Sequence, residues 1–232
     1  MDKIIAHRGV FDNKDVVENT MQAFDLAIRK RIPFELDIQL TKDNQIVVYH
    51  DFNLARLSNS NKIIQESTYN ELKEIKLLNT DSTIPLFKDI LELNNDKVLI
   101  DIEIKKTKRI QETVDLLVEL LKPYTNYMIK SFDPRIVKYV NKNYSWIKVG
   151  LLIENKYDNF LEEKLLKSKF IINYCKPDFV AISKKLLDNQ KFMNKIKDIP
   201  ILIWTIKDDK EIKYDSDYTY ICNNLMNKKK KM

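Results

Sequence analysis

Short apolar runs alternate with amphipathic stretches along almost the whole chain. Eight apolar runs are typical of buried strands and lie at 3–6, 34–40, 98–104, 126–131, 147–153, 178–183, 200–205 and 218–222, with a shorter one at 45–49. Helical periodicity occurs between them at 20–31, 68–76, 87–94, 108–121, 134–143, 158–174, 188–197 and 208–214. This alternation predicts an α/β protein built as a closed parallel (β/α)8 TIM barrel, with an open doubly wound sheet as the alternative.

The chain is expected to form one domain followed by a short tail. No linker-like segment or change of composition divides residues 1–226, which we assign to a single barrel. Residues 227–232 are basic and are expected to be disordered, and positions 228–231 are all lysine. These four lysines supply most of the formal net charge of +6. The small remaining charge predicts no nucleic-acid partner, while the tail leaves open a weak contact with an anionic membrane surface.

Few features of the sequence bear on where in the cell the protein is located. The chain enters a strand pattern within its first residues, and no apolar stretch approaches the roughly 18 residues that a membrane helix needs. Cys175 and Cys222 are too few for a disulfide scaffold and have no metal-ligand spacing, so they are expected to be core thiols. A cytoplasmic location is the expectation.

Two of the predicted strands carry charged residues at every second position. Glu35, Asp37 and Gln39 share one face of the second strand, and Asp101, Glu103 and Lys105 share one face of the third. In a barrel, helices cover the outer face, so these side chains point inward, where unpaired carboxylates are costly. A divalent cation such as Mg²⁺ or Ca²⁺ would neutralise Glu35, Asp37 and Glu103, whose oxygens are hard ligands. The alternative is a set of internal salt bridges to Lys105 and Arg8.

The chain contains two histidines, and each closes an apolar run. They occur as His7-Arg8-Gly9 and His50-Asp51. Histidine is the usual side chain for moving protons near neutral pH, so His7 and His50 are candidates for an acid/base pair. Taken singly, each is more readily a turn or core residue than a catalytic one. Gly9 favours a site, because the chain retains only two glycines where about sixteen are typical, and such a glycine implies a positive φ or a close approach.

Together these residues are suited to cleaving a phosphodiester. Arg8 and Lys105 match phosphate oxygens, the carboxylates match a cation that polarises a phosphoryl oxygen, and the histidines match proton transfer. The sequence has no Gly-x-Ser-x-Gly elbow and too few glycines for a nucleotide-binding loop, so those classes of site are excluded.

The ordered set of motifs resembles the glycerophosphodiester phosphodiesterase family. The motifs are His7-Arg8-Gly9, Glu18-Asn19-Thr20, Glu35-x-Asp37, His50-Asp51, Leu54-x-Arg56, Glu103-x-Lys105, Ser131-Phe132 and Trp204-Thr205. The resemblance implies a (β/α)8 barrel and metal-dependent hydrolysis of deacylated phospholipids to sn-glycerol 3-phosphate and an alcohol. It also implies that the neighbouring glycerol hydroxyl attacks phosphorus and that water opens the cyclic phosphate so formed.

The resemblance assigns roles by position. It implies Glu35, Asp37 and Glu103 as metal ligands and His7 and His50 as the acid/base pair. It further implies that Arg8 and Lys105 hold the phosphate and that Glu18 shapes the site. Trp204, with Phe132 and Phe11, is a candidate for an aromatic wall that contacts the alcohol, although core packing is the other interpretation.

The chain departs from the family pattern mainly in its late part. Val17 stands where a proline is common, Lys207 where an asparagine is common, and Asn223 and Asn224 where a Thr-Asp pair is usual. The link at 52–97 is short, which predicts only a small insertion after the second strand and an open pocket. Two alternatives remain, a related phospholipase-type phosphodiesterase barrel and a catalytically silent barrel that binds a phosphorylated metabolite. The sequence leaves open monomer or homodimer, Ca²⁺ or Mg²⁺, the alcohol released, and which histidine is acid.

Overall fold

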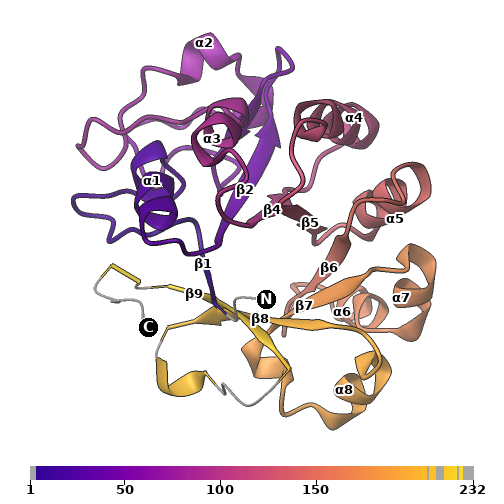
Figure 1. Cartoon of the computed structure of the whole chain (residues 1–232). Helices are drawn as coiled ribbons and strands as arrows, with labels where there is room; N and C mark the ends of the chain where they lie inside the picture. Colours follow the sequence, from indigo (N-terminus) through magenta and orange to yellow (C-terminus); the bar gives the residue numbers. More distant parts are fainter. Residues whose placement is uncertain (1–3, 208, 213–216, 224, 227–232) are drawn as a thin grey trace.

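The strands close into a barrel. The computed structural model describes residues 4–207, 209–212, 217–223 and 225–226. Within these residues, eight parallel strands follow one another around a ring: β1 (Ile4–Ala6), β2 (Phe34–Leu40), β4 (Ile100–Ile104), β5 (Tyr127–Ser131), β6 (Val149–Ile153), β7 (Phe179–Ser183), β8 (Ile201–Ile206) and β9 (Thr219–Cys222). Because β1 pairs with both β2 and β9, the barrel has no open edge (Figure 1). The predicted (β/α)8 barrel is confirmed, and the doubly wound alternative is wrong.

The short run predicted at 45–49 is β3 (Ile46–Val48), which is not a barrel strand. It pairs antiparallel with β2 from outside the ring, with Ile38 opposite Val48 and Leu40 opposite Ile46. The chain therefore turns back after β2 and returns beside it, and the amide of Tyr49 donates to the carbonyl of Asp37 at 2.9 Å. This hairpin brings residue 50 back to the level of the β2 carboxylates. The sequence pattern gave no direction for this strand.

Helices surround the barrel at most of the predicted positions: α1 (Met21–Arg29), α2 (Tyr69–Leu72), α3 (Phe87–Asn94), α4 (Ile110–Leu121), α5 (Pro134–Asn143), α6 (Phe160–Leu166), α7 (Lys169–Cys175) and α8 (Gln190–Ile196). Three short 3-10 turns lie at Ile64–Glu66, Lys184–Leu186 and Asp209–Glu211. The single helix predicted at 158–174 is wrong, because the hydroxyl of Ser168 accepts from the amide of Ile171 and starts a new helix. The helix predicted at 208–214 is only the last 3-10 turn within the described residues.

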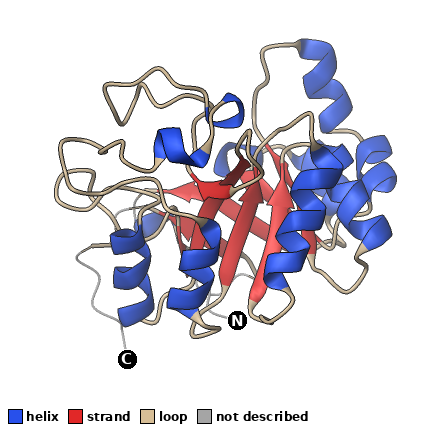
Figure 2. Ribbon diagram, turned by 90° about the horizontal axis from the view of Figure 1, so that it is seen from above, coloured by secondary structure: helices blue, strands red, loops and turns tan. Residues whose placement is uncertain are grey.

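Apolar side chains lie on both faces of the barrel wall. Those on the outer face, such as Leu36, Ile38 and Ile102, pack under the helices in the main core. On the inner face a smaller cluster fills much of the barrel: Ile5, Met128, Leu152, Phe179, Ala181, Leu202 and Ile221. Figure 2 shows the strands enclosed by helices, with the long loops at the end of the barrel away from the N-terminus. These loops surround the charged residues of β2 and β4.

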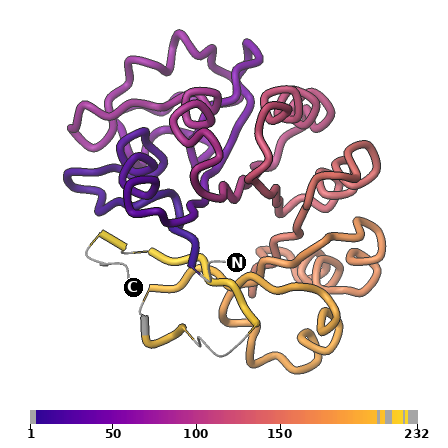
Figure 3. Tube along the Cα trace, in the orientation of Figure 1, coloured from indigo at the N-terminus to yellow at the C-terminus, as the bar shows by residue number. Residues whose placement is uncertain are grey.

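The connection from β2 to β4 forms the expected small insertion. Figure 3 shows it as the violet to magenta trace at the upper left of the ring. It has a small apolar core of its own, which includes Val47, Tyr49, Leu54, Ile64 and Leu72. The insertion is therefore a packed structure beside the barrel mouth. Across the described residues, we find no helix with the length and apolar character needed to cross a bilayer.

Gly9 adopts the positive φ that the sequence predicted, at +82°. Its close neighbour is helix α1, since a Cβ at this position would lie 2.9 Å from the backbone carbon of Ala23. The glycine therefore lets the loop after β1 pass close to α1 while it carries His7 and Arg8. This position demands glycine for packing as well as for φ.

We expect Gly9→Ala to destabilise the protein by about 1–3 kcal/mol, because alanine is strained at this φ and meets the α1 backbone. Chemical denaturation followed by circular dichroism measures the effect. An unchanged midpoint of unfolding would contradict this account of Gly9.

The basic tail lies outside the described residues, so its predicted disorder and membrane contact remain predictions.

Candidate active site

The three predicted metal ligands lie together at the mouth of the barrel. Strands β2 and β4 pair in register, which sets Asp37 beside Glu103 and Glu35 beside Asp101. Glu35, Asp37 and Glu103 are buried, and each offers an oxygen atom within 4.8 Å of those of the other two. This spacing and the all-carboxylate donor set fit a hard divalent cation.

Cations and an amide surround the same carboxylates. The Lys105 ammonium lies 2.7 Å from Glu103 and 3.3 Å from Asp37, and the Asn19 amide donates to Asp37 at 2.8 Å. Burial by itself raises the pKa of Asp37, but the charges of Lys105 and Arg8 outweigh it and hold that pKa well below its usual range. The internal salt bridges considered from the sequence are therefore present, and those to Asp37 keep that carboxylate ionised.

His7 lies between the carboxylates and the last barrel strand. Its Nδ1 is 2.7 Å from the side-chain oxygen of Asn223, and its Nε2 is 4.0 Å from Glu35. Because an amide oxygen only accepts, Nδ1 carries the proton and Nε2 keeps a lone pair. Burial, and then the charge of Arg8, lower the pKa of His7 to about 4. His7 is therefore neutral at neutral pH.

His50 is oriented by its neighbour in sequence. Its Nδ1 lies 2.6 Å from a carboxylate oxygen of Asp51, whose other oxygen accepts from Arg56 Nε at 2.6 Å. The Gln39 amide donates to the carbonyls of Tyr49 and Asp51, at 2.9 and 2.8 Å, and so fixes the backbone on both sides of His50. The carboxylate fixes the ring tautomer, with Nε2 directed away from Asp51.

Glu18 joins two segments around the mouth, the loop after β1 and the insertion. Its carboxylate accepts from Arg8 at 2.6 Å, from Arg56 at 2.7 and 3.1 Å, and from Asn13 at 2.8 Å. Burial raises the pKa of Glu18, but hydrogen bonds and charge from Arg56 and Arg8 outweigh it and lower that pKa to about 2. Arg8 also donates its backbone amide to Glu35 at 3.0 Å. Glu18 thus holds Arg8 next to the carboxylate cluster.

One cavity of about 210 Å³ gathers most of the predicted site. It is lined by His7, Arg8, Glu35, His50, Glu103, Lys130, Phe132, Leu152, Glu154, Trp204, Thr205 and Ile221. Asp37, Lys105 and Glu18 are not lining residues, but each contacts one that is. Phe132 and Trp204 meet edge to face, with ring centroids 5.5 Å apart. Phe11, the third aromatic candidate, is not in the lining.

Sequence reasoning missed several residues of the site. Lys130 is fully buried, with its ammonium 2.5 Å from Asp101 and 3.3 Å from Glu35. Burial raises the pKa of Asp101 to about 6 despite Lys130. The sequence signal for Lys130 was its position within the largely apolar strand β5. Asn223 was noted only as a departure from a pattern, and Glu154, the first residue after β6, gave no signal.

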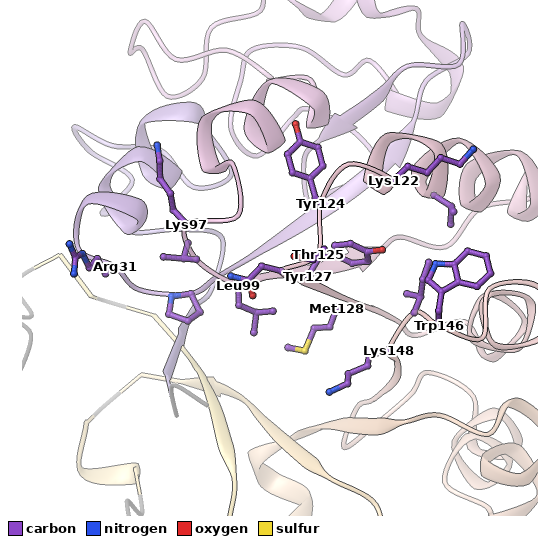
Figure 4. Close-up of a pocket in the computed structure, with 15 residues that line it drawn as sticks. Arg31, Lys97, Leu99, Lys122, Tyr124, Thr125, Tyr127, Met128, Trp146 and Lys148 are labelled. Atoms are coloured by element: carbon purple, nitrogen blue, oxygen red, sulfur yellow. The ribbon is translucent and has the colours of Figure 1, made fainter.

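A larger hollow of about 900 Å³ lies at the opposite end of the barrel, before strands β2, β4, β5 and β6. Figure 4 shows its lining, in which Lys97 and Lys122 point away from each other. Neither histidine nor any of the clustered carboxylates reaches it. Because barrel enzymes work at the carboxyl ends of their strands, its greater size does not make it the active site.

The barrel and its charged mouth define a hydrolase of phosphoric diesters. The chain matches the model of the glycerophosphoryl diester phosphodiesterase family over residues 7–223 and belongs to that family. A glycerophosphodiester phosphodiesterase of Caldanaerobacter subterraneus is 33% identical over 65% of this chain and 66% of its own, just under two thirds of each. The solved structure of the Thermotoga maritima enzyme is 27% identical, covers 97% of this chain and 96% of its own, and superposes with a TM-score of 0.74.

A third comparison bears on the fold. An Oleispira antarctica phosphodiesterase, solved in complex with its product sn-glycerol 3-phosphate, has a TM-score of 0.78 at 20% identity and covers 97% of this chain and 93% of its own. With these matches, the chain is a glycerophosphodiester phosphodiesterase by class.

Proposed function

We propose that this protein hydrolyses deacylated phospholipids such as glycerophosphocholine to sn-glycerol 3-phosphate and an alcohol, and so serves glycerol and phospholipid catabolism. One observation carries the proposal: His7, His50, Arg8, Glu35 and Glu103 line a single cavity. Trp204 and Thr205, from the end of the family motif set, line the same cavity, so that the start, the middle and the end of the set converge on it.

The carboxylate cluster would hold the cofactor. Glu35, Asp37 and Glu103 would supply oxygen ligands to Mg²⁺ or Ca²⁺, which their proximity and burial support. When bound, such a cation polarises a phosphoryl oxygen and stabilises the charge that develops in the reaction. Lys105 holds two of these carboxylates in place, and its charge also favours the approach of the phosphate.

The surroundings of the two histidines support a division of roles. His7 is neutral and keeps a lone pair on Nε2, so it is suited to take the proton from the attacking glycerol hydroxyl. Asp51 accepts from Nδ1 of His50 and so orients the ring, which is suited to give a proton from Nε2 to the departing alkoxide. In the second step water opens the cyclic phosphate, and the two histidines exchange roles.

Arg8 is the first candidate for the phosphate. Its side chain lines the cavity, and its buried Nε makes no hydrogen bond among the described residues, although it forms an ion pair with Asp37 at 3.5 Å. Glu18 holds the other end of the guanidinium at 2.6 Å, which orients the unused N–H. A buried donor without a hydrogen bond favours an incoming acceptor, and a phosphate oxygen is an acceptor of the right charge.

Product analysis tests the proposal. Purified protein with Mg²⁺ or Ca²⁺ is expected to convert glycerophosphocholine to glycerol 3-phosphate, measured with a coupled dehydrogenase, and to release choline, measured by mass spectrometry. Glycerol and phosphocholine as products would contradict the proposed bond cleavage. Preference for intact phospholipid would favour the phospholipase-type alternative, and binding without turnover would favour the silent barrel.

A further inference from the structure

The lining of the catalytic cavity comes from two sides of the barrel. The proton-transfer and carboxylate groups come from β1, β2, β4 and the hairpin. Glu154 follows β6, Phe132 follows β5, and Trp204 lies on β8. In the order of the strands around the ring, β6 lies four places from β1, which is diametrically opposite. Glu154 therefore approaches the cavity from the side facing His7 and Arg8.

Glu154 differs from the other carboxylates of the site in having no cation. Glu35, Glu103 and Glu18 each lie within 4.0 Å of a lysine or arginine nitrogen. Within the described residues, no lysine, arginine or histidine nitrogen lies that close to Glu154, whose one recorded side-chain bond is from the amide of Asn155 at 2.6 Å. The side chain is only partly exposed, so water screens its charge incompletely.

An unpaired carboxylate is unexpected in a cavity that takes a phosphodiester. Its charge repels the phosphate and disfavours a neutral or anionic alcohol next to it. A cationic alcohol reverses the sign of this interaction. The neighbouring aromatic pair points to the same chemistry, because Phe132 and Trp204 stand at 89° to each other and an alkylammonium group is attracted to aromatic faces.

We infer that Glu154, Phe132 and Trp204 form a subsite for the ammonium group of the alcohol, so that the chain selects glycerophosphodiesters of amino alcohols such as choline or ethanolamine. The inference rests on the proposed function and deepens it. The phosphate lies against Arg8 on one side of the cavity, and the ammonium lies against Glu154 on the other. Glu154 acts on selectivity and takes no part in the transfer of protons.

Two substrates of equal shape that differ only in the charge of the alcohol separate the effect of that charge from the effect of shape. Glycerophosphocholine is compared with the ester of 3,3-dimethylbutanol, in which a carbon replaces the choline nitrogen. We expect kcat/KM to be at least about 10-fold higher for the choline ester, a preference of the size that one charge interaction provides. In Glu154→Gln, this ratio is expected to fall several-fold, toward the smaller preference that the aromatic faces alone provide, through loss of activity on the choline ester alone. The exposed Glu162→Gln on α6 serves as the matched control and keeps the wild-type ratio.

The possible outcomes separate the inference from the proposed function. Equal kcat/KM values for the two esters in the unaltered protein, or an unchanged ratio in Glu154→Gln, would overturn the subsite. An equal loss on both esters in Glu154→Gln would also overturn it, by assigning Glu154 to the catalytic or metal machinery. If neither ester is turned over, the proposed function fails, and calorimetric binding of both esters to His50→Ala protein still decides the charge preference.

Discussion

We expect His7→Ala and His50→Ala each to lower kcat on glycerophosphocholine by about 100-fold or more, the range in which a positioned acid or base contributes. The reason lies in their surroundings. His7 offers a lone pair on Nε2, and Asp51 orients the ring of His50 through its Nδ1. Steady-state kinetics with saturating metal measures the effect. Tyr49→Phe serves as a control, because Tyr49 is a buried neighbour of His50 with no proposed role in proton transfer.

The pH dependence distinguishes a base from a merely structural His7. Because burial and Arg8 lower the pKa of His7 to about 4, its neutral form persists well below pH 6.5 and is lost only as pH falls through about 4. The rate should therefore show no decline centred near pH 6.5 on the acid side. A midpoint there, or nearly normal turnover in His7→Ala, would remove His7 from the base role.

We expect chelation with EDTA to abolish turnover, and added Mg²⁺ or Ca²⁺ to restore it. The same ion raises the melting temperature of the unaltered protein, because a ligand that binds only the folded state stabilises it by about 2.7 kcal/mol at 100 times its Kd. In Glu103→Gln, we expect a loss of activity of about 100-fold or more and no thermal shift, since the change removes a charged ligand from the cluster.

The thermal shift gives a test of metal binding that is independent of activity. Glu119→Gln is the matched control, because Glu119 is an exposed carboxylate near the end of α4 and away from the mouth. It should retain both the activity and the shift. Turnover that EDTA leaves unchanged would eliminate the metal from the proposal, and a normal shift in Glu103→Gln would eliminate Glu103 as a ligand.

Much of the barrel was predictable from local periodicity. The eight parallel strands and the inward face of Glu35, Asp37 and Glu103 follow from alternation along each strand, which depends on neighbouring residues only. The split of the helix predicted at 158–174 was harder to see, because one serine side chain decides it. The antiparallel direction of β3 could not be predicted for another reason, because a short apolar run does not indicate the strand with which it pairs.

Other parts of the site depend on contacts between distant positions. Asn223 orients His7 across 216 residues of sequence. Lys130 meets Asp101 because β5 lies next to β4 in the closed ring. Single residues of these types carry no signal by themselves. Their roles emerge only when the register of the strands is known, which is why the sequence singled out the carboxylates and histidines but not Asn223 and Lys130.

The carboxylate of Glu18 has a consequence for the energetics of binding. By joining Asn13, Arg8 and Arg56, it ties the loop after β1 to the insertion before any substrate arrives. The conformational entropy of ordering this wall is therefore lost during folding, so substrate binding does not lose it again. The insertion is therefore held in place as a preorganised wall of the mouth.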